Sequence, residues 1–302
     1  MNLSLNLLPP RLRPLARAGV PLAPLTTFRI GGAAALLVEP ASLRDVSDLL
    51  AACRASGVPL FVLGGGSNLL VSDEGVPGVV VSLARLKKIQ VIGSHVIAQA
   101  GANLATLVTR CSQAGVAGPQ ALAGIPGTVG GALAMNAGGR HGEIADWVER
   151  VIWVNPRGEL ESLYREEIAF GYRSSTLREG VVVEAWLHGG VGEPAELAAR
   201  ARTILQEKLA AQPYSEFSAG CAFQNPKGMS AGRLIDLAGC KGLGVGGAQV
   251  STMHGNFIVN TGSATASQVL ELMRVVQDRV QSAHGVRLEP EVRIWPACAP
   301  AA

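Results

Sequence analysis

The uneven placement of glycine is the feature that most constrains how this chain can fold. Of its 302 residues 37 are glycine, and they gather at 64–66, 124–142 and 239–247. A flexible linker would be polar, whereas the segment 124–131 carries apolar residues between its glycines. Glycine has no Cβ, so a backbone rich in glycine can approach another group closely. The segment that begins at Gly124 therefore indicates backbone pressed against a large flat ligand, or else a tightly packed crossing inside a core.

Length and composition narrow the class of protein. A chain of 302 residues exceeds one ordinary hydrophobic core, so two or three domains are expected. Apolar residues make up 48% and charged residues 16%, which excludes a disordered chain. The formal net charge of +3 comes without a dense block of Lys or Arg, so no nucleic-acid partner is expected.

Cysteine spacing and hydropathy bear on location. The five cysteines include no Cys-x-x-Cys pair, so neither a zinc site nor a disulfide framework is expected, and a reducing cytoplasm fits best. No run of 18 apolar residues is present, so no membrane association is expected. Residues 1–20, rich in proline, are expected to form a loose extension.

Hydrophobic periodicity predicts an α+β fold in which hairpins alternate with helices. Helices are predicted at 42–56, 104–111, 194–211, 231–238 and 266–284. Hairpins are predicted at 89–99 and 150–163, and further strands at 59–63, 79–83, 181–187, 248–251, 256–260 and 286–295. Three glycines at 189, 190 and 192 suggest a linker before the long helix at 194.

The first glycine loop has the composition of an anion site. Gly64, Gly65 and Gly66 follow a predicted strand and are succeeded by Ser67 and Asn68. Consecutive glycines let several backbone N–H groups converge, which suits a pyrophosphate. The loop is neither the Gly-x-Gly-x-x-Gly fingerprint nor a phosphate loop with Gly-Lys-Ser/Thr. The alternative is a flexible turn at the end of the strand.

Three further side chains are candidates for chemistry, each with a structural alternative. Arg173 could clamp a carboxylate with its planar fork, or lie on the surface. Cys221 follows small residues, so its thiol could be accessible and donate a proton, since an ordinary thiol has a pKa of about 8.5; it could equally be a small buried residue. Alternation in 286–295 places four charged residues on one face, which is either solvated or aims one carboxylate into a cleft: Arg287, Glu289, Glu291 and Arg293.

In their order along residues 21–295, these segments resemble the UDP-N-acetylenolpyruvoylglucosamine reductase (MurB) family. The resemblance rests on a set of ordered motifs: Thr27 to Gly32, Gly64 to Val71, Ala123 to Gly131, Tyr172 to Ser175, Ser218 to Pro226, Lys241-Gly242, Gly247 to Ser251, Asn256 to Asn260 and Leu288 to Arg293. It implies a two-subdomain FAD-binding module of the vanillyl-alcohol-oxidase type, followed by a smaller α+β substrate-binding domain. The implied ranges are an extension at 1–20, FAD subdomains at 21–85 and 86–192, and a substrate domain at 193–302.

The resemblance also implies which residues bind ligands. FAD, held non-covalently, is expected to contact a set drawn from the glycine segments and their neighbours: Arg29, Gly64, Gly65, Gly66, Ser67, Asn68, Gly124, Ile125, Pro126, Gly127, Thr128, Gly130, Gly131 and Asn136. The UDP-sugar substrate is expected to contact Tyr172, Gln224, Asn225, Arg233 and Lys241. No metal is implied, and a monomer is expected.

The reaction implied by the resemblance is NADPH-dependent and supplies a peptidoglycan precursor. A hydride passes from N5 of reduced FAD to the enolpyruvyl ether of the UDP-sugar, and a proton completes the lactyl ether of UDP-N-acetylmuramate. Arg173 would stabilise the enolate-like charge that develops. Cys221 would donate the proton, and Glu291 would polarise the enolate or orient the donor.

Two positions depart from the family's usual pattern. Cys221 stands where the family usually has serine, and a thiol is a stronger acid that adds sensitivity to oxidation and to alkaline pH. Gln224 stands where the family often has lysine, a loss for which Arg233 or Lys241 could compensate. The short interval between Arg173 and Cys221 resembles the form that lacks an inserted tyrosine-bearing loop.

Two other functions are compatible with the same motifs. The first is an FAD-linked oxidase, many of which tether the flavin through a histidine near the first glycine loop. No histidine is close to Ser67 and Asn68, which favours non-covalent FAD. The second is a non-catalytic nucleotide-sugar binding protein, against which the presence of Arg173, Cys221 and Glu291 argues.

Overall fold

Residues 3–296 are described by a computed structural model, and they form two compact units. Unit 1 contains the chain up to Ala18 together with Ala35–Gly65 and Gly78–Lys208. Unit 2 contains Gly19–Ala34, Gly66–Pro77 and the chain from Leu209 onward. Each unit has its own cluster of buried apolar side chains. The mixture of antiparallel sheets and helices confirms the predicted α+β class.

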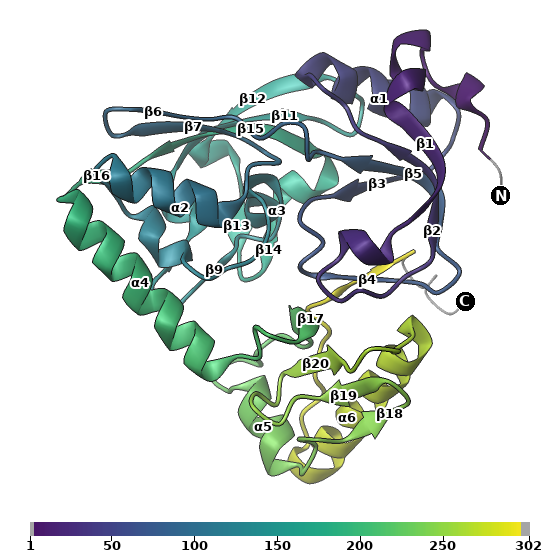
Figure 1. Ribbon diagram of the computed structural model, residues 1–302, viewed down its shortest axis with the longest axis vertical. Helices are drawn as coiled ribbons and strands as arrows, with labels where there is room; N and C mark the ends of the chain where they lie inside the picture. Colours follow the sequence, from purple (N-terminus) through teal and green to yellow (C-terminus); the bar gives the residue numbers. More distant parts are fainter. Residues whose placement is uncertain (1–2, 297–302) are drawn as a thin grey trace. The chain divides into compact units, whose positions relative to one another are not determined.

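Unit 1 is built on a five-stranded antiparallel sheet in the order β12-β11-β15-β7-β6 (Figure 1). Its strands are β6 (Ile89–Ile92), β7 (His95–Gln99), β11 (Val148–Val154), β12 (Leu160–Tyr164) and β15 (Val181–His188). Helices α2 (Leu104–Gln113) and α3 (Val129–Ala134) lie on one face of this sheet (Figure 1). Buried apolar side chains of the strands and helices, such as Val151, Ala185 and Leu107, meet there and form the core. Asn103 and Thr128 cap the two helices, which fixes where each begins.

The first glycine loop follows the last strand of a four-stranded sheet, whose order is β1-β2-β5-β3. Its strands are β1 (Ala16–Pro21), β2 (Ala33–Val38), β3 (Leu60–Leu63) and β5 (Val76–Ser82). Strand β3 pairs in parallel with β5 through Leu63 and Ser82, so Gly64 emerges directly from the end of a paired strand. Helix α1 (Leu43–Ala55), capped by Ser42, precedes this strand.

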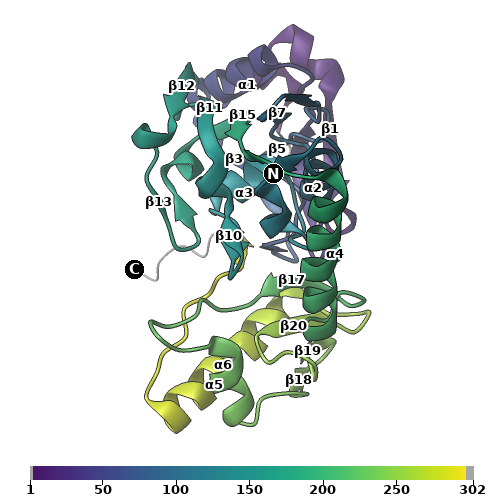
Figure 2. The same cartoon turned by 90° about the vertical axis from the view of Figure 1, so that its left-hand side faces the viewer.

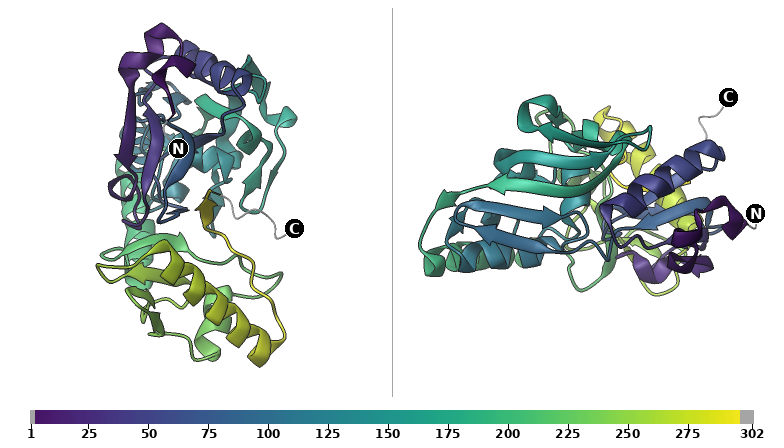
Figure 3. Two further views of the ribbon diagram at one scale, coloured as in Figure 1. Left: turned by 90° about the vertical axis from the view of Figure 1, so that its right-hand side faces the viewer. Right: turned by 90° about the horizontal axis from the view of Figure 1, so that it is seen from above.

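Unit 2 contains a second four-stranded sheet and two helices (Figure 2). The sheet has the order β17-β20-β19-β18, with β17 (Phe217–Cys221), β18 (Gly244–Val245), β19 (Ala248–Val250) and β20 (Phe257–Asn260). Helix α6 (Ala266–His284), the long yellow-green helix in the left panel of Figure 3, packs against β18, β19 and α5 (Ala231–Leu237). The core of this unit draws on all three of its segments, because Phe28, Ile30 and Leu70 belong to it.

One long helix and a set of short elements make up the rest of the described chain. Helix α4 spans Pro194–Ala211, and the remaining strands are β4 (Leu69–Val71), β8 (Val116–Ala117), β9 (Gly138–Gly139), β10 (Gly142–Glu143), β13 (Phe170–Gly171), β14 (Ser174–Ser175), β16 (Gly190–Val191) and β21 (Arg293–Trp295). Short 3-10 helices lie at Leu5–Leu7, Pro10–Leu15, Ala23–Leu25, Pro119–Leu122, Ile144–Trp147, Arg165–Glu167 and Thr176–Glu179. Within residues 3–296, no helix is long and apolar enough to cross a membrane, and no cluster of side chains could hold a metal ion.

Three expectations about local structure are wrong. The N-terminal residues are not loose, because Leu8 and Leu12 are 1% and 0% exposed within the core of unit 1. Their prolines prevent an α-helix but allow the 3-10 turn at Pro10–Leu15. The strand predicted at 286–295 is confined to β21, although Leu288 and Val292 are buried as the alternation requires. The glycines at 189–192 are no linker, since β16 pairs with β8 inside unit 1.

Asp73 joins two segments of unit 2 at the start of α6. Its carboxylate accepts hydrogen bonds from the backbone N–H groups of Ala266 at 2.7 Å and Ser267 at 3.0 Å, and from the Ser267 hydroxyl at 2.8 Å. Partial burial acts to raise the pKa of Asp73, but these three bonds outweigh it and the pKa is lowered. The charged carboxylate therefore stabilises the first turn of the helix.

Replacing Asp73 with Asn should lower the free energy of unfolding at pH 7 by about 0.5 kcal/mol, because the amide keeps one accepting oxygen but removes the negative charge at the start of the helix. A lowered pKa means that this contribution is present above the ordinary carboxyl pKa of about 3.9 and is lost as the pH falls through the folded value. Urea unfolding at pH 7 and at pH 3 measures both effects. Glu74→Gln is the matched control, and an equal loss in that variant would contradict the role of Asp73.

Candidate active site

The two glycine segments of unit 1 meet backbone to backbone. A Cβ on Gly65 would lie 2.8 Å from Gly127 Cα, and one on Gly64 would lie 2.8 Å from Thr128 Oγ1. Real Cβ atoms do not approach this closely, so only glycine fits at position 65, where the neighbour is backbone, and a larger residue at position 64 would have to displace the Thr128 hydroxyl. The first loop and the 124–131 segment, far apart in sequence, therefore form one continuous backbone surface.

This surface has the properties of an anion cradle. Gly64, Gly65 and Gly131 are exposed and have no side chain to cover their backbone. Within residues 3–296, the amide groups of Gly64 and Gly65 donate no hydrogen bond. Exposed amide groups on adjacent glycines bind phosphate oxygens. The cradle fits the pyrophosphate of a dinucleotide such as FAD, and a side chain at Gly64 or Gly65 would clash with the opposite loop.

Other residues of the second glycine segment are used for packing. Gly130 is buried, and a Cβ there would lie 2.8 Å from the Cβ of Ala100. Asn136 is 1% exposed and has a φ of +44°, and its side chain donates to Gly171 O at 3.1 Å and accepts from Ala145 N at 3.4 Å. Asn136 thus links α3 to the β13–β14 hairpin.

Arg173 lies at the tip of that hairpin. Strands β13 and β14 are joined by only two residues, Tyr172 and Arg173, and Arg173 has a φ of +53°. Its Nη1 donates to Gly138 O at 3.0 Å, and the Ser175 hydroxyl anchors the hairpin by donating to Leu133 O at 2.8 Å. A tight turn with a guanidinium held at a fixed carbonyl is preorganised, as a group that stabilises developing charge must be.

A further cation of unit 1, Lys208 near the end of α4, was not predicted from the sequence. Its Nζ donates to Ala123 O at 2.6 Å, at the start of the second glycine segment. Burial, together with the positive charges of Arg173 and Arg140, lowers the pKa of Lys208 to about 8. Arg140 is paired with Glu207, so Arg173 and Lys208 are the two cations that give this region a positive field suited to an anionic ligand. No sequence signal distinguishes Lys208 from other basic residues of the same helix.

In unit 2, Cys221 and Glu291 lie on adjacent segments. Ala222 O accepts from Glu291 N at 2.8 Å, and Phe223 forms an antiparallel bridge with Pro290. Asn68 completes the arrangement, because its Nδ2 donates to Glu291 O at 3.2 Å. Three segments far apart in the sequence are thus held together by hydrogen bonds next to β17.

Cys221 differs from the other described cysteines in its exposure. Its residue is half-buried, whereas Cys53, Cys111 and Cys240 are buried. Burial raises the pKa of Cys53 to about 11 and that of Cys111 to about 12, so these thiols are poor nucleophiles. Cys298 lies outside the described residues. Among the described thiols, Cys221 is therefore the one that is not buried, and its role as proton donor stays a prediction.

Gly124, Ile125 and Pro126 lie in unit 1 with the rest of the second glycine segment, whereas the remaining predicted residues fall in unit 2, with Gly66 and Ser67 at its edge. Arg29 has a φ of +57°, donates to Pro24 O at 2.8 Å and lies over the Phe217 ring. The predicted substrate-binding side chains are arranged around α5: Asn225 Oδ1 accepts from Ala231 N at 2.9 Å, Lys241 pairs with Asp236 at 3.0 Å, Gln224 Nε2 lies 3.5 Å from Pro290 O, and Arg233 is exposed.

Comparison with known proteins agrees with this geometry. Residues 34–164 match the family model "FAD binding domain", and residues 212–295 match "UDP-N-acetylenolpyruvoylglucosamine reductase, C-terminal domain". The chain is 42% identical over 285 residues to the reductase of that name from Synechococcus sp. (strain CC9605), covering 92% of this chain and 95% of the relative. It is 43% identical to the one from Paramagnetospirillum magneticum (strain AMB-1), covering 94% and 93%.

A solved structure extends the similarity to three dimensions. The UDP-N-acetylenolpyruvylglucosamine reductase (MurB) of Thermus caldophilus aligns with a TM-score of 0.80 and 41% identity, covering 93% of this chain and 98% of that one. Fold and site together define a flavoprotein with an FAD-binding domain. The chain belongs to the UDP-N-acetylenolpyruvoylglucosamine reductase family, which confirms the resemblance and the fold expected from it.

Proposed function

We propose that this chain binds FAD non-covalently and uses NADPH to reduce UDP-N-acetylglucosamine-enolpyruvate to UDP-N-acetylmuramate, a precursor of peptidoglycan, in the cytoplasm. The observation that carries the proposal is the half-buried Cys221 on the segment bonded to Glu291, at the positions that the family uses for its proton donor and its glutamate. The glycine cradle of unit 1 supports the cofactor assignment.

The chemistry divides between the cofactor and the protein. Bound FAD supplies hydride transfer, and the protein must hold the substrate and stabilise the charge that appears beside its carboxylate. Arg173 provides a permanent positive charge, and the bond from its Nη1 to Gly138 O keeps the guanidinium in place before the charge develops. Lys208 adds to the field that attracts an anionic substrate, whereas the charge of Arg140 is offset by its pair with Glu207.

Proton delivery is assigned to unit 2. The Cys221 thiol holds the proton that completes the reduced ether, and its sulfur becomes a thiolate when the proton leaves. Glu291 is placed on the neighbouring segment, where its carboxylate is suited to orient the donor or to polarise the substrate. Asn68 fixes the backbone of Glu291, which keeps the two side chains on adjacent segments.

The cofactor assignment leads to a direct test. Purified protein should be yellow and should release FAD into the supernatant on acid denaturation. Gly65→Ala should weaken FAD binding at least about tenfold, because its Cβ would lie 2.8 Å from Gly127 Cα. Gly139→Ala is the matched control, since a Cβ there meets nothing within 4 Å. Titration of stripped protein with FAD measures both affinities.

Two results would contradict the assignment. A colourless protein that binds no added FAD would rule out the proposed function, and yellow colour retained on precipitated protein would show covalent attachment. For the yellow protein, anaerobic reduction with NADPH followed by the enolpyruvyl substrate tests the reaction itself. The flavin absorbance should be lost in the first step and return in the second.

A further inference from the structure

The strand that carries Cys221 contains one residue more than its partner. Ser218 pairs with Val259 in the β17–β20 ladder, and the next pair along is Cys221 with Phe257. Three steps on β17 therefore match two steps on β20. An extra residue on one strand of an antiparallel pair is a β-bulge, which changes the face on which the following side chain lies.

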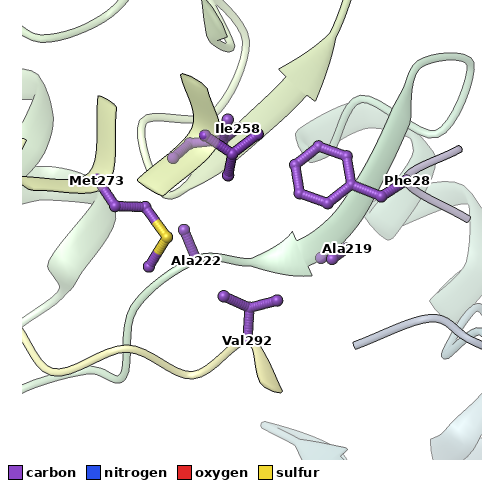
Figure 4. Close-up of a pocket in the computed structure, with 8 residues that line it drawn as sticks. Phe28, Ala219, Ala222, Ile258, Met273 and Val292 are labelled. Carbon is purple, nitrogen blue, oxygen red and sulfur yellow. The ribbon is translucent and has the colours of Figure 1, made fainter. Parts of the chain in front are cut away.

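The bulge decides which side chains of β17 enter the core. In a regular strand alternate residues share a face, so Cys221 would lie on the same face as Ala219. Ala219 is 4% exposed and borders an apolar cavity of about 10 Å³. Ala222, three positions along rather than two, is 6% exposed and borders the same cavity (Figure 4). The alternation has shifted by one residue, and the half-buried Cys221 is displaced from the core position.

Gly220 is the residue that allows the shift. Its φ is +76°, in the left-handed region that L-residues other than glycine rarely adopt. Space does not require glycine here, because a Cβ would meet only Ser67 O at 3.9 Å. The requirement lies in the backbone conformation itself.

Both ends of the bulge are fixed. The Thr27 hydroxyl donates to Ser218 O at 2.7 Å on one side. On the other side Ala222 N donates to Asn256 O at 2.8 Å, and Ala222 O accepts from Glu291 N at 2.8 Å. The strand cannot slide to absorb the extra residue without breaking these bonds.

We propose that Gly220 is a positioning residue, whose left-handed conformation forms the bulge that turns the Cys221 thiol out of the core of unit 2. The catalytic part of this inference rests on the proposed function, because it makes the bulge a condition for proton delivery by Cys221. The structural part concerns only the exposure of the thiol and is tested independently of turnover.

The first experiment changes Gly220 in a Cys298→Ser background and follows alkylation of Cys221 by iodoacetamide, with the modified peptide identified by mass. Gly220→Ala should slow alkylation at least about tenfold, because alanine disfavours the left-handed conformation. Gly220→Asn should return the rate to within about threefold of the starting value, since asparagine tolerates this conformation. Reoxidation of the reduced flavin by the enolpyruvyl substrate should fall and recover in parallel.

Gly285→Ala is the matched control. Gly285 ends α6 with a φ of +70° and has open space around its Cβ position, so the substitution imposes the same backbone demand elsewhere in unit 2. It should leave the alkylation of Cys221 unchanged. Wild-type alkylation in Gly220→Ala would overturn the inference. Slowed alkylation with unchanged flavin reoxidation would support the bulge and refute Cys221 as the proton donor.

A second experiment leaves Gly220 intact. In protein carrying Cys221→Ser and Cys298→Ser, a cysteine is introduced by Ala219→Cys or by Ala222→Cys. Both introduced thiols should react at least about 100-fold more slowly than Cys221, because both positions face the core and burial suppresses the thiolate. A thiol at either position that reacts as fast as Cys221 would show that no change of face occurs at Gly220.

Discussion

Replacing Arg173 with Ala should slow reoxidation of the reduced flavin by the enolpyruvyl substrate by about 10²–10³-fold, the usual cost of removing one preorganised group from a developing negative charge. The bond to Gly138 O holds the guanidinium in place. The free-energy cost of orienting this group is therefore met when the protein folds and not during the reaction. Arg173→Lys should recover only part of the loss, because an ammonium cannot reproduce the planar fork. Anaerobic stopped-flow measurement of the flavin absorbance gives the rate.

The specificity of this effect depends on two comparisons. Flavin reduction by NADPH should be unchanged in Arg173→Ala, since that step develops no charge on the substrate. Arg178→Ala is the matched control, because Arg178 lies close in sequence to the same hairpin and is exposed, with only a 3.5 Å contact to the Ser174 hydroxyl. A comparable loss of rate in Arg178→Ala would show that removing any nearby positive charge slows the reaction, and it would refute the catalytic role of Arg173.

Replacing Cys221 with Ala should slow flavin reoxidation by the substrate by about 10²–10⁴-fold, the range that a positioned proton donor contributes. Reduction by NADPH should continue at the normal rate, because no proton from Cys221 enters that step. Cys221→Ser should retain substantial activity, since a hydroxyl can occupy the same position and donate. Unchanged turnover in Cys221→Ala would remove Cys221 from the mechanism.

Thiol reagents provide an independent readout of the same residue. They should inactivate the wild-type protein, and Cys221→Ser should be resistant, because the other described cysteines are buried. Inactivation that persists in Cys221→Ser would direct attention to Cys298, which a Cys298→Ser variant then tests.

Local signals in the sequence predicted most helices closely. Ser42, Ser230 and Thr265 cap α1, α5 and α6, and Gly285 ends the last of them in the left-handed conformation. Such helix ends can be predicted from sequence because a cap is a contact between residues only three or four positions apart. The glycine clusters were similarly informative, since the clash of a Cβ on Gly65 with Gly127 is what excludes other residues.

Contacts between segments that are distant along the chain could not be predicted from the sequence. The sequence from Phe217 to Cys221 does not by itself predict a bulge, because a bulge is defined by how the residues of β17 pair with those of β20. The same limit applies to Lys208, whose importance comes from the Ala123 carbonyl 85 positions away. The strand predicted at 286–295 is too long because Leu288 and Val292 are buried, as in a strand, although the backbone before β21 does not pair in a regular sheet.

The interleaving of the two units has a consequence for how this protein can be divided. A fragment that begins at residue 212, where the C-terminal family model begins, would lack Phe28, Ile30 and Leu70 of the core to which its own side chains belong. It would also lack Asp73, which accepts hydrogen bonds from the first two N–H groups of α6. Sequence modules and folding modules therefore do not coincide in this chain. A chimera that exchanges substrate-binding regions between relatives must carry three separate stretches of the gene, and a simple truncation would expose apolar surface and invite aggregation.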